Sequence, residues 1–279
     1  MRTRRTFNGL LTVLGFARRG FYIPYRGAVD VPMPGTVPAY AAIAKCFAAR
    51  EEAFSAHLDA IEACAAGLEA LGGEPPPAPR WTQDWFPRLD AAAAYAMVRR
   101  FRPRRIVEVG CGHSTRFLAR AVADTRIAAR ITAIDPAPRA VLAGLGVELL
   151  RLPVQRAGLQ PFAELRPDDL LVVDSSHVLM PGSDVDFVLN RVLPELAAGV
   201  LVHFHDIFLP GDYPAAWGWR AYNEQLAVAA LVATGAYEPE FASAYLVARG
   251  AAALRRGVLG RLPLPPGAYE SSLWLRKAR

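Results

Sequence analysis

The ten residues 105–114, which read RIVEVGCGHS, decide the fold of this 279-residue chain. The first five are typical of a β-strand, the two glycines of a tight turn, and Ser114 of the N-cap of a helix over Ser114–Ala123. A strand, a glycine turn and a helix N-terminus in this order bring the backbone close to a nucleotide-like ligand. This stretch therefore predicts a ligand-binding loop within an α/β domain.

Helices and strands alternate on both sides of this loop. Helices are predicted upstream, over Leu89–Phe101, and downstream, over Tyr222–Ala233. Further strands are expected at Ile131–Ile134, Val147–Leu152, Leu170–Val173, Val200–Phe204 and Ser272–Arg276. Short runs rich in Val and Leu are typical of parallel strands that are buried on both faces. The pattern predicts an α/β fold with a doubly wound, Rossmann-like sheet, and we expect the last strand to close its edge.

A helical extension is expected before this domain. Residues 37–71 are mostly strong helix formers, which predicts one amphipathic helix. Its apolar stripe recurs every seven positions, at Phe47, Phe54, Ile61 and Leu68. The proline-rich run 75–79 cannot continue a helix and should form a stiff linker. We therefore divide the chain into 1–80, a basic arm, amphipathic helix and linker, and 81–279, the α/β domain; the heptad stripe could also pair subunits in a homo-oligomer.

The formal net charge of +6 is concentrated at the N-terminus. Six arginines precede the first acidic residue, Asp30, so residues 30–279 sum to zero (+6 − 6). A protein that neutralises several phosphates needs clustered Lys and Arg on its binding face. We therefore expect no nucleic-acid partner for the α/β domain.

The first twenty residues combine a basic head with an apolar stretch, as signal peptides do. Arg18 and Arg19 follow without a small-residue cleavage pattern, so we expect this segment to be retained. The apolar runs are too short to span a bilayer, although this amphipathic segment could touch an anionic membrane surface. The three cysteines, Cys46, Cys64 and Cys111, form no disulfide framework, and a cytoplasmic location fits best.

A carboxylate at the end of the next strand supports cofactor binding. Asp135 follows Ile131–Ile134, where an acid can accept hydrogen bonds from both ribose hydroxyls of an adenosine-containing cofactor. A nicotinamide dinucleotide is the alternative, but Thr115 stands where the pyrophosphate fingerprint requires a small residue. The glycine loop and Asp135 together therefore predict a nucleotide-like cofactor.

Glu108-x-Gly110-x-Gly112 together with Asp135 resembles the first two signature motifs of class I S-adenosylmethionine-dependent methyltransferases. The segments 169–177 and 200–208 resemble the fourth and fifth strands of a bacterial subgroup of mostly uncharacterised small-molecule methyltransferases, so that the similarity covers about 81–279. The resemblance implies S-adenosylmethionine as cofactor and a reversed last strand. Residues expected to form the cofactor site are Glu108, Gly110, Cys111, Gly112, His113, Asp135 and Asp174.

Histidines and acids should gather at the carboxyl ends of the fourth and fifth strands. His177, His205 and Asp206 are the candidate catalytic residues, with either histidine as general base for an acceptor hydroxyl. Asp174, His205 and Asp206 could instead hold a divalent metal, but magnesium prefers oxygen ligands, so a metal is not favoured. His203, deeper in the same strand, has a structural interpretation, as buried histidines commonly do.

These observations predict transfer of a methyl group from S-adenosylmethionine to a small-molecule acceptor, preferably at oxygen. The aromatic loop 210–219 could form a lid over that acceptor. Two alternatives stay open. One is a non-catalytic cofactor-binding or interaction module. The other is an NAD-dependent oxidoreductase, which the absence of a Tyr-x-x-x-Lys arrangement disfavours, because the only lysines are Lys45 and Lys277.

Overall fold

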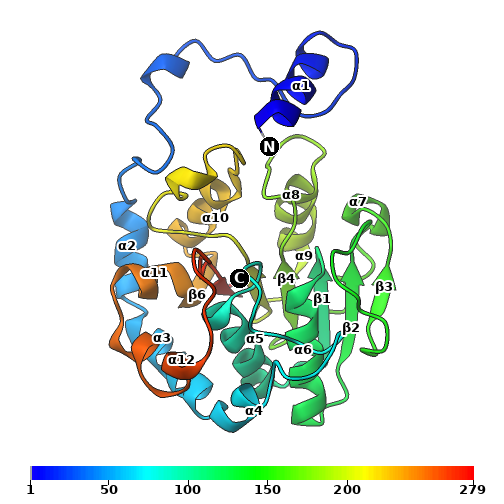
Figure 1. The fold of residues 1–279 in the computed structure, drawn as a ribbon, viewed down its shortest axis with the longest axis vertical. Helices are drawn as coiled ribbons and strands as arrows, with labels where there is room; N and C mark the ends of the chain where they lie inside the picture. The colour runs from blue at the N-terminus through cyan, green and yellow to red at the C-terminus, as the bar shows by residue number, and fades with distance from the viewer. Residues whose placement is uncertain (1) are drawn as a thin grey trace.

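A seven-stranded sheet forms the centre of the molecule in the computed structural model, which describes residues 2–279 (Figure 1). Met1, the first residue of the predicted basic arm, lies outside the described residues. The strands are β1 (Arg105–Val109), β2 (Arg130–Ile134), β3 (Glu148–Leu150), β4 (Leu170–Val173), β5 (Leu201–Phe204), β6 (Tyr237–Ala242) and β7 (Leu273–Lys277). Their order is β3-β2-β1-β4-β5-β7-β6. The first five strands are parallel, and β7 is antiparallel to both of its neighbours.

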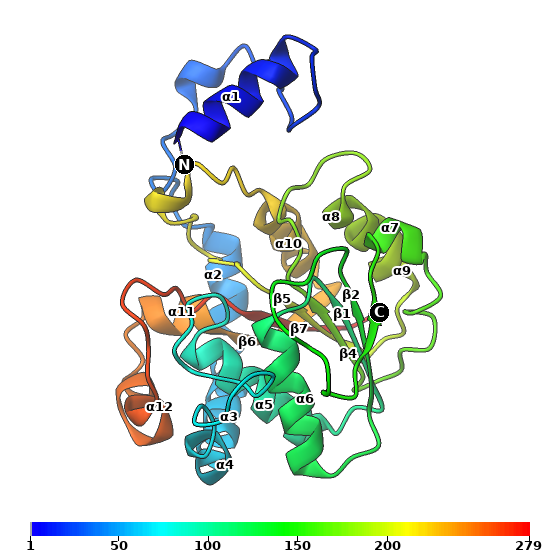
Figure 2. The same cartoon turned by 45° about the vertical axis from the view of Figure 1, so that its right-hand side comes forward.

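Helices cover both faces of this sheet. Figure 2 shows α5 (Arg88–Phe101) and α6 (His113–Thr125) on one face, with α8 (Asp184–Phe187), α9 (Leu193–Glu195) and α10 (Glu224–Ala233) on the other. The shorter elements are α7 (Val154–Ala157), α11 (Ser243–Ala248), α12 (Gly257–Arg261), a π-helical turn at Val188–Val192 and 3-10 turns at Ala28–Asp30, Ala215–Trp217 and Ala252–Arg255. The predicted doubly wound, Rossmann-like fold with a reversed last strand is confirmed.

The sequence predicted that the last strand closes the edge of the sheet, and this prediction is wrong. β7 is inserted between β5 and β6, so β6 is the edge strand. β6 contains Glu238, Pro239 and Glu240, which interrupt the alternation of apolar residues, so no strand was predicted here. Because proline cannot donate a ladder hydrogen bond, it is tolerated at such an edge, and the pairing with β7 is irregular between Pro239 and Phe241.

The single helix predicted over 37–71 is three helices, α2 (Ala41–Ala48), α3 (Glu51–Glu62) and α4 (Ala65–Glu69). The chain turns at Arg50 and Cys64, whose ψ angles of 11° and 5° interrupt the helix. All four stripe residues, Phe47, Phe54, Ile61 and Leu68, are fully buried in the core that also contains α5. The stripe therefore packs into the core of its own chain.

The N-terminal arm begins with α1 (Arg2–Val13), which stands apart from the body in both views of the ribbon (Figures 1 and 2). Across residues 2–279, no helix has the length and apolar character that crossing a bilayer requires.

Candidate active site

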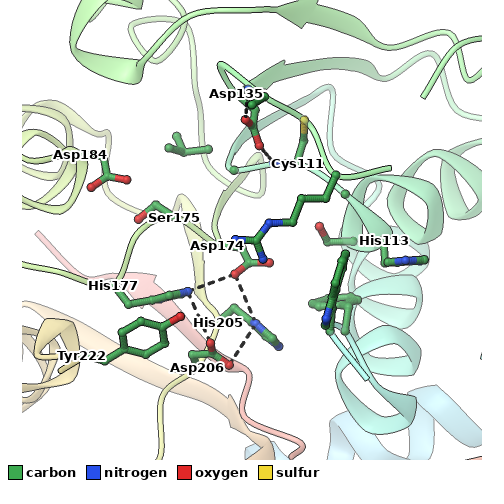
Figure 3. A pocket seen from close by; sticks show the side chains of 18 of the residues that line it. Cys111, His113, Asp135, Asp174, Ser175, His177, Asp184, His205, Asp206 and Tyr222 are labelled. Atoms are coloured by element: carbon green, nitrogen blue, oxygen red, sulfur yellow. Dashed lines mark hydrogen bonds and ion pairs between the residues drawn. The ribbon is translucent and has the colours of Figure 1, made fainter. Parts of the chain in front are cut away.

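A cavity of about 710 Å³ opens at the carboxyl ends of the parallel strands (Figure 3). Strand register produces this arrangement, because Val109 of β1 lies beside Val173 of β4, and Val173 beside Phe204 of β5. The residues that follow these strand ends, Gly110, Asp174 and His205, therefore meet at one edge of the sheet and line the cavity.

Gly110 is the position where the loop requires glycine. Its φ of +79° lies in the left-handed region, and a Cβ atom here would lie 1.8 Å from the carbonyl oxygen of Asp174. No larger residue can bring β1 and β4 together in this way. Gly112 differs, because its φ of 178° lies outside the left-handed region and a Cβ atom would meet nothing within 4 Å.

Glu108 supports the loop from behind and is not among the residues that line the cavity. Its fully buried carboxyl group accepts hydrogen bonds from Ser114 Oγ at 2.5 Å and Thr115 Oγ1 at 2.6 Å. Burial raises the pKa of Glu108 to about 8. Ser114 is therefore not the helix cap that the sequence predicted: α6 begins at His113, and the Ser114 hydroxyl is used by Glu108.

Asp135 lies opposite the glycine loop and lines the cavity. Its Oδ2 accepts a hydrogen bond from the Cys111 backbone N–H at 3.0 Å, and its Oδ1 accepts one from Ala137 N–H at 2.7 Å. Each carboxylate oxygen has a second lone pair, so Asp135 can still accept hydrogen bonds from a ligand. The Cys111 thiol is buried, and burial raises its pKa, so it is no nucleophile.

Three buried polar atoms of cavity-lining residues lack a hydrogen-bond partner within the described residues. They are Nδ1 of His113, Oγ of Ser175 and Nε of Arg220. Burial, reinforced by the charges of Arg116 and Arg80, lowers the pKa of His113 to about 4, so its ring is neutral and can either donate or accept. Because buried polar groups are normally hydrogen-bonded, these atoms indicate that a polar ligand completes the wall.

Four side chains form an acid–base cluster on the other side of the cavity (Figure 3). Asp174 Oδ1 lies 3.3 Å from His177 Nε2 and 3.4 Å from His205 Nδ1. Asp206 bridges the same two rings, 3.5 Å from His177 Nε2 and 3.4 Å from His205 Nδ1. Asp174 has the most open side chain, 28% exposed, against 4% for each histidine. The structure thus brings together all three predicted catalytic residues and one residue predicted for the cofactor.

Two further acids, which sequence reasoning missed, bind the outer nitrogens of these rings. Glu224 Oε2 lies 2.9 Å from His177 Nδ1, and Asp90 Oδ2 lies 3.3 Å from His205 Nε2. Both acids are fully buried. Asp90 also accepts hydrogen bonds from the backbone N–H groups of Ser271 and Ser272. A signal was present for Asp90, the only charged residue in the buried helical run 89–98, but its partner could not be read from the sequence.

The carboxylates control the charge of both histidines. Burial by itself would lower the pKa of His177, but its hydrogen bonds to Asp174 and Glu224 and the charge of Asp206 raise that pKa well above the usual value. The pKa of His205 is raised in the same way, against burial, by Asp174, Asp206 and Asp90. Both rings are therefore mainly imidazolium near neutral pH.

Backbone strain is concentrated in the same cluster. His177 has a φ of +58° and Asp206 a φ of +56°, in the left-handed region that costs most residues free energy. Such strain persists only where surrounding contacts hold the chain in place. The ion pairs described above supply these contacts.

His203 lies behind the cluster and does not line the cavity. It is fully buried, and its Nε2 is 2.8 Å from Ser272 Oγ. Burial, with the charge of His205, lowers the pKa of His203 to about 3, which keeps this ring neutral. These contacts agree with its structural interpretation.

The donor set at Asp174, His205 and Asp206 fits a divalent metal poorly. Both ring nitrogens of His205 face carboxylates, and an imidazolium ring has no lone pair for a metal. Among residues 2–279, no three His, Cys, Asp or Glu side chains are arranged to hold a metal ion.

Aromatic side chains line the cavity next to the cluster. Tyr222 lies with its ring centroid 4.6 Å from that of His177, and Trp217 packs edge-on against Tyr269 at 5.3 Å. All three aromatic residues line the cavity, together with Arg220, whose guanidinium stacks 4.0 Å over Trp217. The other tryptophan of this loop, Trp219, is 48% exposed and is not among the residues that line the cavity.

The sequence from 107 to 207 matches a family model described as a methyltransferase domain. Over this span the chain is similar to methyltransferases. The matched residues extend from β1 to just beyond Asp206, so they include the glycine loop, Asp135 and the acid–base cluster. A search of curated proteins found no match.

Solved methyltransferase structures show distant similarity. The SAH-bound PaMTH1 of Podospora anserina is 15% identical, with a TM-score of 0.41 over 93% of this chain and 100% of that one. MycE of the mycinamycin pathway, in complex with Mg, SAH and mycinamycin VI, is 16% identical, with a TM-score of 0.37 over 65% and 47%. A Bacillus cereus O-methyltransferase in complex with SAH is 16% identical, with a TM-score of 0.31 over 80% and 86%. At these TM-scores the three structures assign no role to any residue of this chain.

Proposed function

We propose that this chain transfers a methyl group from S-adenosylmethionine to an oxygen atom of a small-molecule acceptor. One observation carries the proposal: a single cavity joins a glycine loop and a strand-end carboxylate, suited to a nucleotide-like cofactor, to a buried acid–base cluster. The sequence match to a methyltransferase domain covers both parts.

The cofactor side rests on Gly110, Asp135, His113 and Ser175. The absence of a side chain at Gly110 allows the cofactor to approach the backbone closely. Asp135 has lone pairs that can accept hydrogen bonds from ribose hydroxyls, and the unpaired atoms of His113 and Ser175 can bind polar groups of the cofactor. When bound, S-adenosylmethionine would supply an electrophilic methyl group. The protein contributes binding, orientation and the exclusion of water.

The acceptor side rests on the acid–base cluster. An acceptor hydroxyl must lose its proton to become a good nucleophile, whereas a neutral amine or a thiolate needs less help. His177 Nε2 or His205 Nδ1, in the deprotonated form, would take this proton, and Asp174 and Asp206 would stabilise the resulting imidazolium. The aromatic wall of Trp217, Tyr222 and Tyr269 would hold an apolar or ring-shaped part of the acceptor.

We also propose that residues 81–279 carry the whole site. The cavity-lining residues run from Asp84 to Tyr269. Residues 1–80 would then contribute to the core through α2–α4 and supply the basic arm.

Calorimetric titration of the purified protein with S-adenosylhomocysteine tests the cofactor assignment. We expect micromolar binding that Asp135→Ala weakens and that the exposed control Asp59→Ala leaves unchanged. Tighter binding of NADH than of S-adenosylhomocysteine would instead support an oxidoreductase.

His177→Gln and His205→Gln test the acid–base cluster. Both variants should retain S-adenosylhomocysteine binding but lose methyl transfer in an acceptor screen with and without a chelator. Unchanged transfer in both variants would remove the cluster from the mechanism.

A further inference from the structure

The N-terminal arm, residues 4–33, carries a surface that the proposed chemistry does not use. Twelve of the 20 large hydrophobic side chains that are exposed in the described residues lie between Phe7 and Met33. Single exposed hydrophobic residues are ordinary, but a concentration of this kind marks an interaction surface.

One face of α1 is apolar and open to solvent. Phe7, Leu10 and Leu14 follow a spacing of three and four residues, which places them on one side of the helix. Leu14 belongs to this side because its backbone N–H bonds the Leu10 carbonyl at 2.9 Å, which extends the last turn. Their exposed fractions are 61%, 55% and 63%. Arg4, three residues before Phe7, lies at the border of this face, and Arg5 lies outside it.

The charge of the arm identifies the partner. Arg4, Arg5, Arg18, Arg19 and Arg26 are all exposed and precede the first acid, Asp30. A second copy of the chain would bring arms of the same charge together, which Coulomb repulsion opposes. A nucleic acid would satisfy the arginines but leave the apolar face in water. An anionic bilayer satisfies both features, since its headgroups attract arginines and its interface accepts apolar side chains.

We propose that the arm docks this protein on the surface of an anionic lipid bilayer. Phe7, Leu10 and Leu14 enter the interface, and the arginines contact the headgroups. This inference is independent of the methyl-transfer proposal.

The segment that directly follows the arm is held to the body beside the cavity. Asp212 Oδ2 accepts hydrogen bonds from the backbone N–H groups of Gly35, at 2.7 Å, and Val37, at 3.4 Å. Asp212 belongs to the loop that also carries the cavity-lining Trp217. Docking of the arm would therefore hold the cavity close to the membrane.

Vesicle flotation with the full chain tests this proposal. One set of vesicles contains phosphatidylcholine alone, and the other contains equal parts of phosphatidylcholine and phosphatidylglycerol. We expect binding to the anionic vesicles only, and its loss when NaCl is raised from about 0.1 M to about 1 M, where the Debye length falls from about 10 Å to about 3 Å.

Two variants separate charge from apolar insertion. Replacing Arg4, Arg5, Arg18 and Arg19 with Gln should weaken vesicle binding at least ~10-fold, and so should Phe7→Ser combined with Leu10→Ser. The matched control replaces four exposed arginines of the body with Gln, and it should bind anionic vesicles as the unaltered chain does. These arginines are Arg104, Arg126, Arg191 and Arg256. Titration with S-adenosylhomocysteine, together with thermal unfolding, checks that each variant is folded.

Three results would overturn the proposal. One is failure of the full chain to bind anionic vesicles, and another is equal weakening by the body control. The third is a dimer in light scattering that the Phe7 and Leu10 substitutions dissociate without any vesicle binding, which would assign the apolar face to a second copy of the chain.

Discussion

Nδ1 of His177, in the loop after β4, lies 2.9 Å from Oε2 of Glu224, the first residue of α10, and both side chains are buried. This contact fixes which ring nitrogen faces the cavity. With Nδ1 held by Glu224, Nε2 is left to face Asp174 and Asp206 at the cavity. In the proposed mechanism, Glu224 would therefore position the base and take no direct part in methyl transfer.

Removing the Glu224 charge should shift the pH profile to lower pH. Glu224 raises the pKa of His177, so Glu224→Gln lowers that pKa, and the deprotonated base appears at lower pH. A hydrogen bond to a charged group contributes about 1.5–3 kcal/mol, which corresponds to a shift of about 1–2 pH units. NMR titration of the imidazole and the pH dependence of kcat/KM would measure it, with the exposed Glu195→Gln as control. An unshifted His177 resonance would contradict this role.

Stability and activity should change with pH in opposite directions. The folded-state pKa values of His177 and His205 lie well above 6.5, so their ion pairs stabilise the fold fully below about pH 6.5. This stabilisation is lost as the pH rises through the folded-state values, while the fraction of deprotonated base grows. Urea unfolding across this range should show a free energy of unfolding that falls with pH, and less steeply in His177→Gln. Identical slopes for the two proteins would show that His177 is not protonated in the fold.

The two glycines of the loop should respond differently to alanine. Gly110→Ala places a Cβ atom against the Asp174 carbonyl at a φ of +79°, which should cost roughly 1–3 kcal/mol of stability. It should also weaken S-adenosylhomocysteine binding at least ~10-fold, or about 1.4 kcal/mol. Gly112→Ala is the matched control for stability, because its Cβ atom meets nothing within 4 Å. Thermal unfolding and calorimetry would measure both effects, and equal losses of stability in the two variants would contradict this assignment.

The helices before residue 80 should unfold together with the sheet. Phe54 is fully buried between the rings of Phe47, Phe241 and Tyr245, so Phe54→Ala should cost about 3–5 kcal/mol. The half-buried Leu58 on the same helix is the control and should cost less when replaced by alanine. Denaturant unfolding followed by two probes would measure this, and a separate early transition would show that α2–α4 fold apart from the α/β domain.

Local patterns were enough to predict the parallel half of the fold. β1, β4 and β5 are short, mainly apolar runs at the buried centre of the sheet, and the glycine loop lies between the first strand and its helix. β6 was missed because Pro239 and two glutamates interrupt its apolar pattern at the edge of the sheet. The breaks at Arg50 and Cys64 were missed because both residues stand among strong helix formers. Helix propensity is a local property and does not show where packing against the core interrupts a helix.

The site was predicted to a similar extent. Motif spacing placed Asp174, His177, His205 and Asp206 at strand ends, where topology brings them together. Glu108 was assigned to the cofactor, whereas its hydrogen bonds go to Ser114 and Thr115. Asp90 and Glu224 could not be found, because their contacts with the histidines span 115 and 47 residues of sequence. Such pairings depend on tertiary packing, which no local pattern encodes.

The position of β7 gives the chain an order of assembly during translation. β6 leaves the ribosome before β7, but it has no place in the sheet until β7 has paired with β5. Ser271 and Ser272, which immediately precede β7, bind Asp90 through their backbone N–H groups, and the Ser271 hydroxyl binds Asp206. A nascent chain can therefore form the cofactor loop while the acid–base cluster is still incomplete. Ligand binding would appear on the ribosome before catalytic competence.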